Sequence, residues 1–195
     1  MLRFVCLNVL VAIAAVAPAG EPTPPVRTEK KVRLEEHKSD GVDRIHRFGD
    51  IYLASQPSAD ALKSLKEQGV VTIINLREAA EMDWDEAAEA EKLGFHYEHV
   101  PIGTLKSLSD ETFGKLRKLL SDPERKSVCM HCASANRVGA VWLAHRVLDD
   151  KVDYQAAAKE AKTIGLRSPE LERIAREYIE RRQKPDAAPK GIAVF

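Results

Sequence analysis

The sequence has no excess of charge of either sign. Its 195 residues include 30 basic and 30 acidic side chains, which gives a formal net charge of zero at pH 7. A chain without net charge has no global field to hold nucleic acid or an anionic membrane surface. We therefore expect no nucleic-acid partner, and any anion must be recognised by a local group of residues.

The sequence also has no apolar run at its start that is long enough to anchor it. The opening segment, "MLRFVCLNVLVAIAAVAPAG", has a basic residue at Arg3 and an apolar run from Phe4 to about Ala17. That run is shorter than the roughly 20 residues that cross a bilayer. Small residues at Ala17 and Ala19 form an A-x-A cleavage pattern. We predict a signal peptide over residues 1–19, with an uncleaved anchor helix as the alternative. The mature protein is expected to be periplasmic or secreted, without stable membrane insertion.

No internal repeat divides the rest of the chain, whose length and 44% hydrophobic content suit a single core. Residues 20–43 are rich in proline and charge, which predicts a flexible linker. The folded domain is expected over residues 44–183, followed by a mobile tail over residues 184–195.

Strand and helix patterns alternate along the predicted domain. Residues 70–77, "VVTIINLR", and 127–131, "SVCMH", are apolar runs typical of strands buried on both faces. Helical patterns lie between the strands, and three more close the chain at about 137–148, 154–164 and 168–182. This order predicts an α/β fold: a three-layer sandwich with a central, mostly parallel sheet flanked by helices.

The segment "VCMHCASANRVGAVWLAHRVL", residues 128–148, carries the strongest chemical signal. Cys132 follows a buried strand and precedes a helix, where open α/β sheets bind their ligands. The helix N-terminus favours an anion there, and His131 and Arg137 add positive charge that favours a thiolate. Arg137 presents a planar fork that matches two oxygens of a phosphate. The intervening small residues, whose backbone amides can turn towards an anion, are Ala133, Ser134, Ala135 and Asn136.

Four motifs in series extend this signal over most of the chain, from about Ile45 to Leu166. They are "ASQPSADAL", "GVVTIINLRE", "LGFHYEHVPI" and "HCASANRVGAVWLAHRV". The chain resembles the cysteine-dependent phosphatases, and more closely the bacterial beta-lactamase-hydrolase-like proteins, phosphatase-like domain. The resemblance implies hydrolysis of phosphate monoesters without a metal or organic cofactor. Cys132 would then form a thiophosphate intermediate and Arg137 would bind the phosphoryl oxygens, with His131 orienting the loop.

The sequence departs from the tyrosine and dual-specificity phosphatases in three respects. Four residues separate Cys132 from Arg137 where those enzymes have five, and Val138 stands where they usually carry serine or threonine. They also place an aspartate general acid on a loop after the preceding strand, and "HVPIGTLKSL" at that position has no acid. Asp110 is the first candidate for the proton donor. The further candidates are Glu98, His99, Asp83 and Asp85.

The short loop leaves two other functions open. Rhodanese-type sulfurtransferases also carry a cysteine after a central strand, a tight loop and an arginine, and they accept sulfur as a persulfide, here on Cys132. Sulfur transfer from thiosulfate needs no acid to protonate an alkoxide. Alternatively, the loop binds anions without turning them over.

Two side chains near the loop have open roles. Cys129 and Cys132 are spaced as a possible redox dithiol, although Cys129 also suits ordinary core packing. With His131 they are too close together to form a tetrahedral metal site, so no metal is expected. Glu81 follows the second central strand, where it either orients Arg137 through an ion pair or carries helix-end charge.

Overall fold

The structure is a computed structural model that describes residues 32–184. The predicted signal peptide, residues 1–19, lies outside the described residues, as do residues 20–31 and 185–195 of the predicted linker and tail. In the described part, six strands form one sheet in the order β1-β2-β3-β6-β4-β5. The strands are β1 (Glu35–Glu36), β2 (Ile45–Phe48), β3 (Ile51–Ala54), β4 (Thr72–Asn75), β5 (His96–His99) and β6 (Val128–His131).

The four strands from β3 to β5 run parallel, whereas β1 and β2 add an antiparallel edge. The centre of the sheet is β6, which pairs with β3 through Ala54 and His131 and with β4 through Asn75 and His131. All four residues of β6 are buried, as expected for a parallel strand covered on both faces. The parallel order brings the carboxyl ends of β3, β4 and β6 to one edge.

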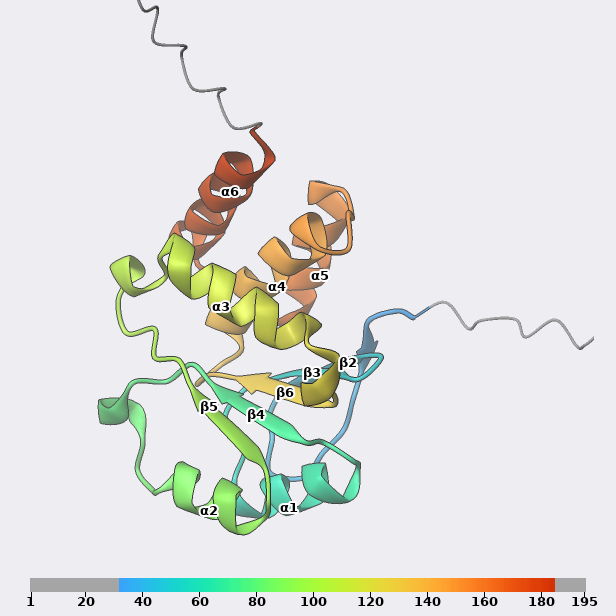
Figure 1. Ribbon diagram of the computed structural model, residues 1–195, viewed down its shortest axis with the longest axis vertical. Helices are drawn as coiled ribbons and strands as arrows, with labels where there is room; N and C mark the ends of the chain where they lie inside the picture. Colours follow the sequence, from blue (N-terminus) through green and yellow to red (C-terminus); the bar gives the residue numbers. More distant parts are fainter. Residues whose placement is uncertain (1–31, 185–195) are drawn as a thin grey trace, which may run out of the picture. The chain divides into compact units, whose positions relative to one another are not determined.

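Helices cover both faces of this sheet (Figure 1). On one face lie α1 (Ala59–Glu67) and α2 (Glu86–Lys92). On the other lie α3 (Asp110–Ser121), α4 (Asn136–Leu148), α5 (Tyr154–Ile164) and α6 (Pro169–Gln183). Short 3-10 turns are η1 (Ala79–Glu81), η2 (Leu105–Ser107) and η3 (Pro123–Arg125). The predicted three-layer α/β sandwich with a mostly parallel sheet is therefore confirmed.

Serine side chains cap the N-termini of several of these helices. The Ser58 hydroxyl accepts a hydrogen bond from the Ala61 amide at the start of α1, and Ser168 accepts one from Leu171 at the start of α6. Each cap satisfies an amide that has no partner within the helix. Every residue of α4 from Val138 to Leu148 is buried, so α4 is the central helix of the four-helix layer.

The predicted linker over residues 20–43 is too long. Glu35–Glu36 forms β1 and pairs with Arg47 and His46 of β2, so part of that segment belongs to the sheet. His37 then bonds through Nε2 to Gln68 Oε1 at 2.8 Å. Proline and charge dominate the segment, but backbone pairing at a sheet edge requires no hydrophobic side chains, which is why composition concealed this strand.

Gly139 lets α4 approach the end of α5 closely. A β-carbon on Gly139 would lie 2.8 Å from the Ala161 carbonyl oxygen and 2.8 Å from the Leu166 β-carbon. We expect Gly139→Ala to lower the free energy of unfolding by about 1–3 kcal/mol, the usual cost of overpacking. Gly114 inside α3 is the matched control, because its β-carbon would meet nothing within 4 Å. There alanine should stabilise by about 0.5–1 kcal/mol, and urea unfolding of both variants checks the difference in sign.

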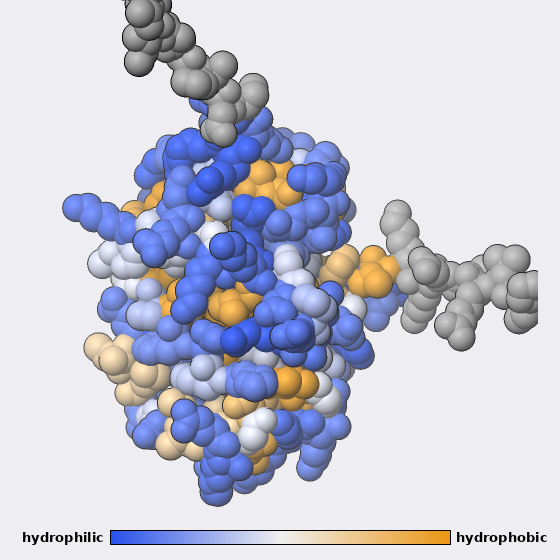
Figure 2. Space-filling model, viewed as in Figure 1, coloured by the Kyte–Doolittle hydropathy of each residue, from blue (hydrophilic) through white to orange (hydrophobic). Residues whose placement is uncertain are grey.

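Hydrophilic residues cover most of the face drawn in Figure 2, and hydrophobic residues form separate small areas. In residues 32–184 the exposed large hydrophobic side chains are Val32 and Leu105. No helix in that range is both long enough and apolar enough to cross a membrane.

Candidate active site

The carboxyl end of β6 carries the candidate nucleophile. Cys132 directly follows His131, the last residue of β6, and its side chain is 1% exposed. Its amide donates to the Ala54 carbonyl at 3.4 Å, which continues the β3–β6 ladder one residue beyond the strand. The chain then turns within four residues into α4. Cys132 therefore lies at the base of a tight loop between a buried strand and a helix N-terminus.

The loop presents free backbone amides. Within residues 32–184, the amides of Ala133, Ser134 and Ala135 donate to no carbonyl or side chain. Ala135 is the N-cap of α4 with φ 63° and ψ 6°, a left-handed conformation that alanine rarely adopts, and no side chain caps the helix. Successive free amides at a helix N-terminus form a concave anion site. The backbone conformation of this loop is thus suited to an oxyanion.

The polar side chains of the loop bind the neighbouring segment, residues 167–168. Asn136 Oδ1 accepts hydrogen bonds from the amides of Arg167 and Ser168, at 2.9 and 3.2 Å. Arg167 Nη2 donates to Ser134 Oγ at 2.8 Å. These bonds tie the loop to the start of α6. The predicted binding residues 133–136 form the loop between β6 and α4, and the backbone amides of residues 133–135 are available to a ligand.

Arg137, the second residue of α4, is held by a carboxylate and two carbonyls. Its two terminal nitrogens contact both carboxylate oxygens of Glu81 at 2.7 Å. Nη1 also donates to the carbonyls of Leu76, at 3.2 Å, and Ile102, at 2.8 Å. This confirms the ion pair as the role of Glu81. A guanidinium has five N–H groups, so Nε–H and one Nη2–H remain as a side-on fork for an oxyanion.

Arg137 interacts electrostatically with two groups, the Glu81 carboxyl and the Cys132 thiol. Burial lowers the pKa of Arg137, but a hydrogen bond to Glu81 and interactions with Cys132 outweigh burial and raise it. The hydrogen bond from Arg137 is the largest cause that lowers the pKa of Glu81 from 4.5 to about 2, against an opposing effect of burial. Glu81 therefore stays ionised at neutral pH and fixes the orientation of the guanidinium.

The Glu81 pKa predicts a pH dependence of stability. Because the folded value lies below the ordinary one, ionised Glu81 stabilises the fold above pH 4.5, and this contribution is lost as the pH falls towards about 2. We expect Glu81→Gln to remove that component, so that acid lowers the stability of the variant less steeply between those pH values. Urea unfolding at a series of pH values measures it; an unchanged acid slope would contradict the assignment.

His131 is fixed from the opposite face of the sheet. Its Nε2 bonds to Glu86 Oε1 at 2.7 Å, with side-chain exposures of 0% and 1%. Gln56 donates to the second Glu86 oxygen at 2.7 Å. Burial raises the pKa of Glu86, but the hydrogen bond and charge of His131, with Gln56 and Arg77, outweigh it and the pKa is lowered. The bond fixes the residue before Cys132, in line with the predicted orienting role.

The predicted redox pair is not formed. Cys129 and Cys132 are both free thiols. Cys129 packs with Leu62 and Phe95 under α1 and α2, whereas Cys132 packs with the residues around α4 on the other face. Three residues of extended strand span roughly 10 Å, beyond the roughly 7 Å that a disulfide can bridge. Burial raises the pKa of Cys129 to about 12, so this thiol is an inert core residue.

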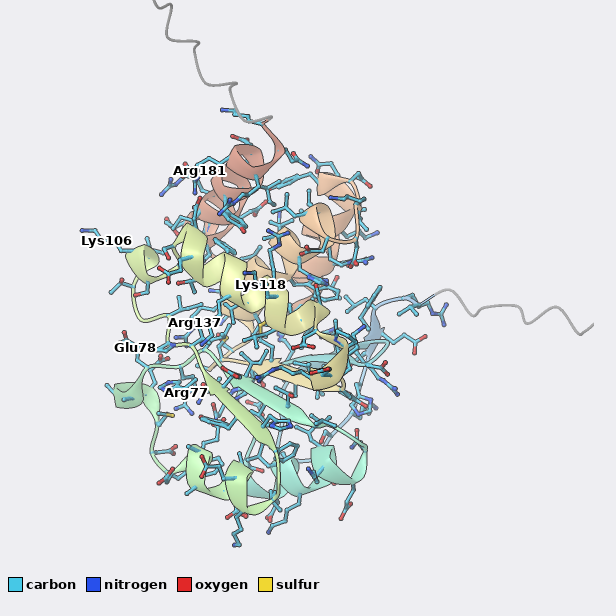
Figure 3. All side chains as sticks on the ribbon, viewed as in Figure 1. Arg77, Glu78, Lys106, Lys118, Arg137 and Arg181 are labelled. Atoms are coloured by element: carbon cyan, nitrogen blue, oxygen red, sulfur yellow. The ribbon has the colours of Figure 1, made fainter. Side chains whose placement is uncertain are left out.

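A cleft of about 430 Å³ opens beside the loop. Its polar lining includes Arg137 and two acidic side chains, Glu78 and Glu81, and its apolar lining comes from Ile102, Leu105 and Leu171. Figure 3 shows Glu78 and Arg137 at the same end of the sheet. The sequence reasoning did not identify Glu78 or Glu86. Glu78 precedes the 3-10 turn η1, and Glu86 is the first residue of α2. Acidic side chains at such positions ordinarily interact with the helix N-terminus.

The predicted proton donors lie elsewhere. Asp110 pairs with Arg181 at 2.6 Å, and this hydrogen bond lowers its pKa, the opposite of what a neutral acid requires. Arg181 lies on α6, well away from Arg137 in Figure 3. Glu98 pairs with Arg125, and Asp85 caps α2. Neither His99, which bonds to the Arg77 carbonyl, nor Asp83 lines the cleft. Asp110 is therefore not favoured as the acid.

Among the described residues, no group of three or more histidine, cysteine, aspartate or glutamate side chains is arranged to hold a metal ion. Positive charge at the loop comes from Arg137, from Arg167, which donates to Ser134, and from the N-terminus of α4.

Several solved structures share this fold. Tk-PTP in its active form is 22% identical, with a TM-score of 0.61 over 68% of this chain and 93% of that one. TpbA of P. aeruginosa in complex with pTyr is 21% identical, with a TM-score of 0.60 over 78% and 91%. A putative phosphatase of Shewanella putrefaciens is 17% identical, with a TM-score of 0.61 over 72% and 94%. No curated protein matches the chain.

The family described as "DSP-PTPase phosphatase fused to NAD+ Kinase" matches residues 30–180, which is most of the sequence. This match agrees with the fold and with the resemblance of the sequence to cysteine-dependent phosphatases. The description of the matching family differs from that of the beta-lactamase-hydrolase-like family. The chain belongs to this family of phosphatases, within the cysteine-dependent protein tyrosine and dual-specificity phosphatase superfamily.

Proposed function

We propose that the protein is a phosphoric monoester hydrolase that works through a cysteinyl thiophosphate on Cys132. The observation that carries this proposal is the arrangement at the end of β6. Cys132 lies at the base of a loop of free amides, and Arg137 is held by Glu81 so that a side-on pair of N–H groups is left for an oxyanion. A nucleophile and an anion clamp thus share one site.

The reaction proceeds in two steps. First, the Cys132 thiolate attacks phosphorus and an S–P bond forms while the bond to the ester oxygen breaks; that oxygen leaves with the bonding electrons and takes up a proton. Second, water attacks the thiophosphate, a proton leaves the water, and the thiolate is released with inorganic phosphate. In both steps the loop amides and Arg137 bind the equatorial oxygens, where negative charge is concentrated.

The cleft favours esters whose leaving group is aromatic or otherwise apolar. Ile102, Leu105 and Leu171 line it beside Arg137, and Leu105 is one of the two exposed large hydrophobic residues in the described part. An apolar wall next to an anion site suits a phosphate attached to an aryl group. Phosphotyrosine, which TpbA binds in its solved structure, is one such ester.

The test uses the purified, reduced protein in two parallel assays. One follows phosphate release from para-nitrophenyl phosphate, and the other follows sulfur transfer from thiosulfate to cyanide. The proposal expects phosphate release without sulfur transfer. Sulfur transfer without phosphate release would overturn it in favour of a sulfurtransferase. Binding of phosphate with neither reaction would overturn it in favour of an anion-binding module.

We also propose that the protein is exported before it acts. The support is the opening segment of the sequence, with Arg3, an apolar run and small residues at Ala17 and Ala19. The N-terminal sequence of the protein recovered from a periplasmic or extracellular fraction tests this. A start close to Gly20 is expected, whereas cytoplasmic protein that still begins at Met1 would contradict it.

A further inference from the structure

The reaction needs a proton for the leaving group, and the loop after β5 has no acid to give it. Two acidic side chains line the cleft in the described part of the chain, Glu78 and Glu81. Glu81 is committed to Arg137 through both oxygens and also accepts a hydrogen bond from the Glu78 amide. An ionised carboxylate held this way has no proton to give. Glu78 is the acid that remains.

The position of Glu78 supports a role at the reacting ester. It precedes η1 on the loop after β4, and its side chain reaches across to Gly103 in the segment after β5. The place that a β-carbon on Gly103 would occupy is filled by the Glu78 carboxylate. Gly103 lies in the segment where the related phosphatases place their acid. The Glu78 carboxyl group therefore lies at that segment, although Glu78 belongs to the loop after the neighbouring strand β4.

The same cleft brings Glu78 together with the anion site. Arg137, Ser134 and Asn136 of the loop and α4 line this cleft together with Glu78 and Gly103. A phosphate on the loop amides would direct its ester oxygen out of the loop, since the attacking sulfur and the leaving oxygen lie in line. Figure 3 shows Glu78 at the outer edge of this end of the sheet.

We propose that Glu78 is the general acid of the proposed phosphatase reaction, and that Gly103 is required because its missing side chain gives Glu78 its place. This inference rests on the proposed function. In the first step the Glu78 carboxyl group gives a proton to the leaving oxygen as the P–O bond breaks. In the second step the carboxylate takes a proton from the attacking water, which returns Glu78 to its starting state.

The test compares two esters in three variants. Para-nitrophenyl phosphate has a leaving group that needs little protonation, whereas phenyl phosphate has a more basic one. We expect Glu78→Gln to lower kcat/KM for phenyl phosphate by roughly 10²-fold and for para-nitrophenyl phosphate by less than about 10-fold. The alkaline limb of the pH–rate profile for phenyl phosphate should disappear. Glu67→Gln, at the exposed end of α1, is the matched control and should leave both rates unchanged.

Gly103→Ala tests the same inference without altering the acid. The new methyl group takes the place of the Glu78 carboxylate, which is the end of a flexible side chain and can swing away. We expect the same selective loss on phenyl phosphate. Equal losses on both esters in Glu78→Gln, or wild-type rates in Gly103→Ala, would overturn the assignment. A wild-type protein that releases phosphate from neither ester overturns the proposed function itself, and the inference with it.

Discussion

Replacement of Cys132 by serine should abolish phosphate release while leaving the anion site intact. The hydroxyl occupies nearly the same volume as the thiol, and the site around it is built from backbone amides and from Arg137, none of which the change removes. In covalent hydrolases, removal of the nucleophile lowers kcat on the order of 10⁶-fold. Initial rates with para-nitrophenyl phosphate measure the loss.

Binding distinguishes loss of the nucleophile from loss of the site. Cys132→Ser should still bind inorganic phosphate, with a Kd within about 10-fold of the wild-type value because the amides and guanidinium persist. Calorimetric titration of both proteins checks it. Cys129→Ser is a contrasting variant: it removes a buried thiol on the other face of the sheet, so it should alter stability more than activity. Phosphate release by Cys132→Ser at the wild-type rate would exclude Cys132 as the nucleophile.

Arg137→Lys should lower kcat/KM by roughly 10³-fold despite the retained charge. A lysine ammonium is a point donor and cannot present the flat fork that contacts two oxygens. It also cannot satisfy Glu81, Leu76 and Ile102 together, all of which Arg137 contacts within 3.2 Å. Removal of a single oxyanion donor costs about 10² to 10³ in rate, and both the donors and their orientation are lost here.

The matched control is Arg176→Lys on the exposed face of α6, where the guanidinium contacts Tyr154 and no cleft residue. It should leave phosphate release unchanged. Thermal unfolding of both variants separates a general loss of fold from loss of the oxyanion contacts. If Arg137→Lys keeps more than a tenth of the wild-type kcat/KM, the side-on fork is not what stabilises the transferred phosphate.

The loop and its flanking elements were predictable because their signals are local. An apolar run, small residues and a helical pattern follow one another within residues 127–148, and the structure puts β6, the loop and α4 there. The separation of Cys129 from Cys132 also had a local signal. Residues three apart on a strand face opposite sides of the sheet, which is why the two thiols of the possible dithiol lie apart in the structure.

The partners of the loop residues could not be predicted, because they come from distant segments. His131 bonds to Glu86, 45 positions away, and Arg137 bonds to Glu81, 56 positions away. In the sequence, Glu86 resembles any solvated acid near a helix start, yet the fold buries it to 1% exposure. Glu78 was hidden for the same reason. Asp110, a predicted proton donor, pairs instead with Arg181 of α6, 71 positions away.

The most direct test of the account is to trap the covalent intermediate. The reduced protein is mixed with excess para-nitrophenyl phosphate, denatured during turnover at a pH that preserves a phosphorus–sulfur bond, and analysed by peptide mass spectrometry. The account predicts the added mass of one phosphoryl group on the peptide that contains Cys132, absent from Cys132→Ser. Turnover with no phosphoryl group on Cys132, or with the group on another residue, would contradict a cysteinyl thiophosphate mechanism.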